Sequence, residues 1–165
     1  EGKSDLSVDW QVTNLSSDEG WDEAMAGCDY VLHVASPIAM QLPKDEDEMV
    51  KPAVEGTLRV LKAASKAGVK RVVITSSVAA IMYGTNKQGV FNEEDWTDPN
   101  SKTTNVYAKS KTLAEQAAWD FMKQDTSGME LSTVLPAMVF GPILEEDFGV
   151  SVGAILDMML SLIHI

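Results

Sequence analysis

Residues 107–111 read Tyr-Ala-Lys-Ser-Lys, so Tyr107 and Lys111 stand four positions apart. On a helix this spacing brings both side chains to one face. A lysine ammonium beside a phenol stabilises the phenolate, and the pair could therefore give or take a proton. Tyrosine and lysine also meet at this spacing by chance, and the pair taken alone is more typical of a solvated helix face.

Hydroxyl groups and small side chains follow two apolar runs that predict strands. Ser76 and Ser77 come after a run that ends at Thr75, and a hydroxyl at the carboxyl end of a strand could hold a carbonyl oxygen. Their alternative role is to satisfy backbone groups where the chain turns. The run His-Val-Ala-Ser-Pro at 33–37 has small residues that would allow a flat ligand to approach closely. His33 itself lies within an apolar run, which favours a buried, hydrogen-bonded histidine over a catalytic one.

Apolar periodicity predicts the elements that must position these side chains. We expect strands at 7–13, 29–35, 71–75 and 130–135, and helices at 17–26, 46–67, 106–123 and from about 147 to 160. Strands alternating with helices predict an α/β fold with a doubly wound parallel sheet, and nearly continuous apolar strands are typical of a sheet covered on both faces. Residues 83–104 predict a long surface loop of the kind that is often functional. The proline-bounded segment 136–142 predicts a rigid loop after the last strand.

Composition limits the class of protein. The chain has 165 residues, 45% hydrophobic and 23% charged, as in an ordinary globular protein, and length alone suggests one domain. Its net charge of −12 argues against a nucleic-acid partner, which would need clustered Lys and Arg. No apolar run is long enough for a membrane span. The single cysteine, Cys28, excludes an internal disulfide and a cysteine-based zinc site, so no metal is expected, and a cytoplasmic location is the simplest expectation.

Five segments together resemble the extended short-chain dehydrogenase/reductase superfamily, and within it most closely the dihydroflavonol reductase-like and aldehyde reductase group. They are GCDYVLHVASP at 27–37, VEGTLRVLKAA at 54–64, KRVVITSSVAA at 70–80, YAKSKTLAEQAAW at 107–119 and LPAMVFGP at 135–142. The resemblance extends from about residue 8 to residue 159. It implies a Rossmann-type sheet and NAD(P)H-dependent reduction of an aldehyde or ketone, with NADP(H) favoured over NAD(H). A small carbonyl compound would be the substrate, and the resemblance allows a homodimer through the helices 46–67 and 106–123.

The resemblance also assigns roles to individual residues. Tyr107 would give its proton to the carbonyl oxygen, Ser77 would hydrogen-bond that oxygen, and Lys111 would bind the nicotinamide ribose and favour the Tyr107 phenolate. Ser77 is chosen over Ser76 because the family's serine directly precedes a small apolar residue, here Val78. Cofactor contacts would come from Asn14, Leu15, Val34, Ala35, Ser36, Thr75, Tyr107, Lys111, Pro136 and Val139. Three apolar residues near these motifs are predicted to line the substrate pocket: Ile38, Met82 and Ile143.

Two departures from the family pattern are expected to matter. The family begins with a strand, a Gly-rich turn that cradles the pyrophosphate, and a helix, whereas no G-x-x-G-x-x-G or G-x-G-x-x-G occurs in this sequence. We therefore expect the first two strands and the C-terminal substrate lobe to be missing, residues 7–13 to lack their neighbouring strand, and the 165-residue chain to be inactive by itself. Residues 1–159 are interpreted as a partial NAD(P)-binding domain. Residues 160–165 are interpreted as a non-native tail, because Leu-Ser-Leu-Ile-His-Ile reads like a translated sequencing adapter.

Two other functions stay open from the sequence. Nucleotide-sugar epimerases and dehydratases share the serine, tyrosine and lysine, and residues 79–84 partly resemble their pattern. A non-catalytic NAD(P)-sensing protein is the third candidate, although such proteins commonly lose the tyrosine or lysine that this chain retains.

Overall fold

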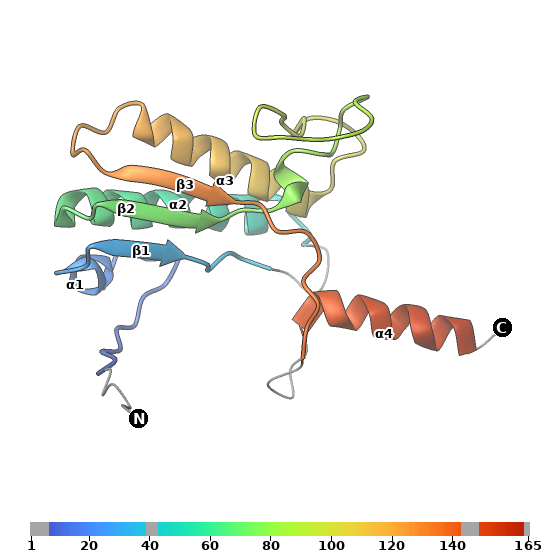
Figure 1. Cartoon of the computed structure of the whole chain (residues 1–165), viewed down its shortest axis with the longest axis horizontal. Helices are drawn as coiled ribbons and strands as arrows, with labels where there is room; N and C mark the ends of the chain where they lie inside the picture. The colour runs from blue at the N-terminus through green and yellow to red at the C-terminus, as the bar shows by residue number, and fades with distance from the viewer. Residues whose placement is uncertain (1–6, 39–42, 143–148, 164–165) are drawn as a thin grey trace. The chain divides into compact units, whose positions relative to one another are not determined.

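The computed structural model describes residues 7–38, 43–142 and 149–163. Three parallel strands, β1 (Tyr30–His33), β2 (Arg71–Thr75) and β3 (Glu130–Val134), form a sheet in the order β1-β2-β3 (Figure 1). Arg71 lies opposite Tyr30 on one side and Glu130 on the other, so the strands begin level and their carboxyl ends meet at one edge. The chain divides into two compact units at Leu135 and Pro136, and each unit is described by itself. The expected α/β class with a parallel sheet is confirmed.

Two long helices connect the strands of the first unit. Helix α2 (Asp47–Ala67) ends at Gly68, whose φ of 75° is the left-handed conformation that glycine adopts without strain. Helix α3 (Val106–Met122) begins at Asn105, whose side-chain oxygen accepts the Ala108 N–H at 2.8 Å. Both helices match their predicted ranges closely. Their boundaries were predictable because a left-handed glycine and an asparagine cap leave clear marks in the sequence.

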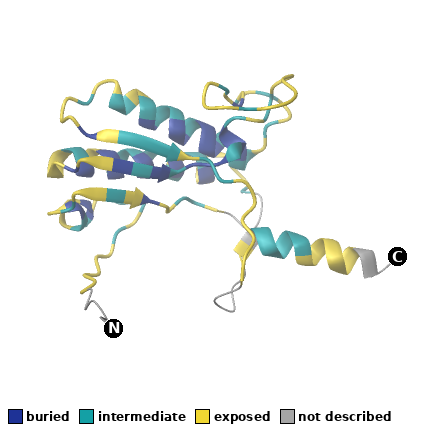
Figure 2. Ribbon diagram, in the orientation of Figure 1, coloured by how far each residue is buried: buried dark blue, intermediate teal, exposed yellow. Residues whose placement is uncertain are grey.

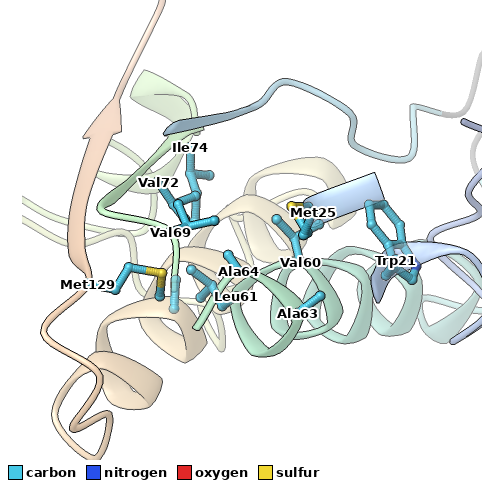
Figure 3. Close-up of a cluster of buried hydrophobic side chains, with 11 residues drawn as sticks. Trp21, Met25, Val60, Leu61, Ala63, Ala64, Val69, Val72, Ile74 and Met129 are labelled. Atoms are coloured by element: carbon cyan, nitrogen blue, oxygen red, sulfur yellow. The ribbon is translucent and has the colours of Figure 1, made fainter. Parts of the chain in front are cut away.

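One core joins the sheet to its helices (Figure 3). Leu61 and Ala64 of α2 are fully buried against Val72 of β2, Ala118 of α3 and the other members of the cluster. Side chains of alternate residues on β2, Val72 and Ile74, point into this core, whereas Tyr30 and Leu32 of β1 are exposed (Figure 2). In the described part of the first unit the helices therefore cover one face of the sheet.

Two N-terminal predictions are wrong. Residues 7–13 form no strand, and Val8, Trp10 and Val12 are all exposed. Among the described residues no strand pairs with this segment, which explains the error, since an alternating pattern becomes a strand only where a partner supplies hydrogen bonds. Helix α1 is the five-residue segment Trp21–Met25 rather than 17–26, because Gly20 at φ 81° ends a turn just before it.

The long loop at 83–104 is tied to the first unit by a buried threonine. Thr97 is 1% exposed, its hydroxyl donates to the carbonyl of Ala79 at 2.8 Å, and it accepts the N–H of Tyr83 at 2.8 Å. Its own N–H donates to the carbonyl of Ala80 at 2.8 Å. These bonds fix the loop to the short 3₁₀ helix η1 (Val78–Ala80), directly after Ser77.

The second unit contains helix α4 (Gly149–Ile163). Within this unit the Val139 N–H donates to the Ser151 hydroxyl at 3.3 Å. The helix continues through residues 160–163, so four positions of the predicted non-native tail are helical here. No helix in the described residues is long and apolar enough to cross a membrane.

Candidate active site

A small pocket lies where β1 and β2 end, between α2 and α3. Its cavity volume is only about 10 Å³, about the room that one water molecule needs. Its lining comes from both strand ends and both helices: His33, Ala35, Ser36, Thr57, Ile74, Thr75, Ser76, Lys111, Ala114 and Glu115. The carboxyl edge of a parallel sheet is the usual position of ligand sites in α/β proteins, so the pocket is the candidate site of this chain.

Lys111 enters the pocket from α3. Its side chain is buried, and the ammonium donates to the Thr75 carbonyl at 3.3 Å. Its Nζ also lies 5.9 Å from the centre of the Tyr107 ring, which confirms that the two side chains share a helix face. Burial lowers the pKa of Lys111, and the carboxylate of Glu115 opposes that shift. The interpretation as a solvated helix face is therefore wrong for Lys111.

The two serines after β2 have different partners. Ser76 donates its hydroxyl proton to Oε2 of Glu115. The Ser77 oxygen instead accepts the Ala79 N–H at 3.1 Å, as the cap of η1. A hydroxyl that accepts from the backbone keeps its own proton to donate. Ser77 can therefore hydrogen-bond a carbonyl oxygen, whereas the Ser76 proton is already used.

His33 lines the same pocket from the end of β1. It is 6% exposed, and burial together with the positive charge of Lys111 lowers its pKa to about 4. The imidazole is therefore neutral at pH 7. Its predicted burial is confirmed.

The structure brings together some of the predicted cofactor residues but not all of them. Ala35, Ser36 and Thr75 line the pocket with Lys111, whereas Val34 is exposed and outside it. Asn14 and Leu15 lie in a turn and do not line this pocket. Asn14 Oδ1 accepts the Ser16 N–H at 2.8 Å, and the Leu15 carbonyl accepts from Arg59 at 2.8 Å.

The predicted substrate walls do not line this pocket. Ile38 and Met82 are exposed, and Ile143 lies outside the described residues. Pro136 and Val139 belong to the second unit. All of these assignments stay predictions.

Glu115 is the site residue that the sequence reasoning missed. It is 5% exposed, and its two oxygens accept from the Ser76 hydroxyl and from the Trp119 indole, the latter at 3.3 Å. Its signal was present in the sequence, because Glu115 follows Lys111 by four positions and so lies on the same helix face. Within the described residues no three His, Cys, Asp or Glu side chains cluster as metal ligands would.

Comparison with known proteins identifies the family. Residues 3–155 match the 3-beta hydroxysteroid dehydrogenase/isomerase family, and the chain belongs to it. Dihydroflavonol 4-reductase of Arabidopsis thaliana is 39% identical over 141 residues, which are 82% of this chain and 36% of that protein. The chain thus belongs to the extended short-chain dehydrogenases and reductases, in the part that contains dihydroflavonol reductases, as its motifs predicted.

Solved structures agree with this assignment. The yeast methylglyoxal/isovaleraldehyde reductase Gre2, in complex with NADPH, superposes with a TM-score of 0.69 at 33% identity, over 80% of this chain and 44% of that one. A short-chain dehydrogenase/reductase superfamily protein from Agrobacterium tumefaciens with bound NAD gives 0.57 at 31% identity, over 74% and 35%. The three-stranded sheet is thus part of a Rossmann-like fold, and the chain spans less than half the length of the proteins that it matches.

Proposed function

We propose that the protein carrying this chain reduces an aldehyde or ketone to an alcohol, with Ser77, Tyr107 and Lys111 as its catalytic residues. The observation that carries the proposal is the position of Lys111. Its ammonium reaches the carbonyl of the residue at the end of β2, beside the serine pair, while Tyr107 lies one helical turn away. The identity to reductases, one of them solved with NADPH, supports the same reaction and favours NADP(H) over NAD(H).

The chemistry of the pocket fits the ribose end of a nicotinamide cofactor. Lys111 has three N–H donors, and the described contact with Thr75 uses one of them. Ala35 and Ser36 present small side chains at the end of β1, which would let a flat group lie close to the backbone there. Ligand sites usually enclose about 300–1,000 Å³. The pocket of this chain, with a cavity volume of about 10 Å³, is far below that range, so its walls would have to open before part of a dinucleotide could enter.

In the proposed reaction each residue acts on one atom. The bound cofactor supplies the hydride that the carbonyl carbon accepts. Tyr107 donates its phenolic proton to the carbonyl oxygen as negative charge develops there. Ser77 donates a hydrogen bond to that oxygen, and Lys111 stabilises the phenolate that Tyr107 leaves behind.

An activity assay on the full-length protein tests the proposal. NADPH oxidation is followed with a panel of apolar aldehydes and ketones, and conversion of a UDP-sugar in the presence of NAD⁺, as the competing substrate class, is followed by chromatography of the products. We expect turnover with at least one carbonyl compound and none with the UDP-sugar. Turnover of the UDP-sugar without carbonyl reduction would overturn the proposal in favour of an epimerase or dehydratase.

A further inference from the structure

The carboxylate of Glu115 is buried in the same pocket as Lys111, and the proposed reaction assigns it no role. Both oxygens of Glu115 accept hydrogen bonds, one from the Ser76 hydroxyl and one from the Trp119 indole. Ser76 belongs to the turn after β2, whereas Trp119 lies one turn further along α3. The two donors therefore hold the carboxylate from the sheet and from its own helix.

This carboxylate faces the lysine pocket. Glu115 and Lys111 are one helical turn apart on α3, and both line the same cavity. They form no close ion pair in the described residues, so Glu115 acts on the ammonium through space while its oxygens stay bonded to Ser76 and Trp119. A charge in a poorly solvated site acts on its neighbours more strongly than it would in water.

The other groups around the ammonium do not supply negative charge. From β1 comes the neutral imidazole of His33, and from α3 itself the phenol of Tyr107. Thr57 of α2, with Thr75 and Ser76 at the end of β2, presents only hydroxyl and carbonyl groups. Among the described residues lining this pocket, Glu115 is the one that carries a negative charge.

We propose that Glu115 is the positioning residue of Lys111: fixed by Ser76 and Trp119, its carboxylate keeps the lysine charged and directed at the end of β2. The catalytic consequence rests on the proposed function, whereas the effect on Lys111 does not. The proposal also explains why two serines stand side by side after β2. Ser77 is available to a carbonyl oxygen, and Ser76 holds the carboxylate that supports the lysine.

The decisive experiment is a titration of Lys111 in the Glu115→Gln variant of the full-length protein. The ε-carbon resonance of Lys111 in 13C-lysine-labelled protein, assigned by its loss in Lys111→Arg, is followed from pH 6 to pH 11. Glutamine keeps the size and an acceptor oxygen but lacks the charge, so the titration midpoint should fall by about one pH unit. Glu130→Gln, which removes an exposed carboxylate bonded to Arg71, is the matched control and should leave the midpoint unchanged.

Two further measurements complete the test. Where the protein reduces carbonyl compounds, Glu115→Gln should lower kcat/KM more at pH 9 than at pH 6.5, since lower pH restores the charge on Lys111. A purely structural role would give a loss that is the same at both pH values. If Glu115→Gln does not fold, Ser76→Ala is used, and the midpoint should move in the same direction by a smaller amount.

An unchanged Lys111 midpoint in a folded Glu115→Gln or Ser76→Ala protein overturns the proposal. The midpoint can be measured without any substrate. A protein that reduces no carbonyl compound but shows the shifted midpoint would refute the proposed function and keep the role of Glu115.

Discussion

At the residue scale, Ser76 and Ser77 show how hydrogen-bond partners decide what a hydroxyl can do. The two side chains are adjacent and both buried, yet Ser76 donates to a carboxylate whereas Ser77 accepts from the backbone.

Replacing Ser77 by alanine should lower kcat for carbonyl reduction about 100-fold, because one donor to the developing oxyanion is lost. Steady-state kinetics on the full-length protein measure this, with Ser76→Ala as the neighbouring control, for which we expect a smaller loss. Equal losses in the two variants would contradict the assignment to Ser77.

Tyr107 gives the sharpest test of the proton transfer. Phenylalanine removes the hydroxyl and keeps the ring beside Lys111, so cofactor affinity should stay within about twofold while kcat falls at least about 100-fold. Fluorescence titration with NADPH and turnover assays separate the two effects. Wild-type turnover in Tyr107→Phe would mean that the proton comes from another group.

His33 gives a pH dependence to stability. Its pKa is about 4 in the folded chain and 6.5 in an unstructured peptide, so the unfolded chain binds more protons between these values. The stability that comes from the neutral imidazole is fully present above about pH 6.5 and is lost as the pH falls toward 4. The loss amounts to about 3 kcal/mol.

Urea unfolding at pH 7.5 and pH 4.5 measures this effect. His33→Asn cannot titrate in that range, so its unfolding free energy should fall less between the two pH values than that of the wild type. Asp95 and Asp125, whose pKa values are lowered by their hydrogen bonds, contribute to both proteins alike and cancel in the comparison. Equal pH dependence in the two proteins would show that His33 is not the group responsible.

At the element scale, Thr97 connects the long loop to η1 and hence to the turn that carries Ser77. Valine has the same shape but lacks the hydroxyl, so Thr97→Val leaves the Ala79 carbonyl and the Tyr83 N–H without their partner. A buried group left unpaired costs about 1–3 kcal/mol. Chemical denaturation should therefore show a loss of this size, and kcat should fall with it. Thr126→Val, at an exposed position, is the control and should change stability by less than about 0.5 kcal/mol.

The elements were predictable where local signals and tertiary packing agree. Helices α2 and α3 and strand β2 match their predicted ranges because periodic apolar residues meet a core there and caps mark the helix ends. Residues 7–13 carry an equally regular alternation and form no strand. An alternating pattern shows which face of a strand would be apolar. Whether the strand forms depends on a neighbouring strand to pair with, and the sequence of the segment itself does not reveal that neighbour.

The candidate site was predictable in part for the same reason. Tyr107 and Lys111 are neighbours on one helix, so their spacing alone places them together. Glu115 has an equally good spacing, but its contact with Ser76 joins residues 39 positions apart and depends on how α3 packs against the end of β2. That two donors hold the Glu115 carboxylate can therefore be recognised only when the fold is known.

At the scale of the whole molecule, the described residues contain a three-stranded parallel sheet, part of a Rossmann-like fold, and the pocket at the ends of β1 and β2. The chain spans 36% of the Arabidopsis relative and 44% of the yeast reductase, and its sequence holds no Gly-rich phosphate motif. The proposed catalytic residues Ser77, Tyr107 and Lys111 therefore occur here in a sequence without that motif. The 165-residue chain should accordingly show no tight NADPH binding by itself in calorimetry, and tight binding would contradict that expectation.

The register of the sheet also governs how this chain can fold. Tyr30 pairs with Arg71 and Arg71 with Glu130, so every strand pair closes a loop that contains a complete helix. Loop-closure entropy must be overcome before such distant pairings bring any gain, and proteins dominated by long-range contacts fold more slowly than helical bundles of equal size. Because their hydrogen bonds are local, we expect helices α2 and α3 to form before the strands pair. During that interval the edges of β1 and β2 are open to other chains, and the rate of refolding will compete with the rate of aggregation.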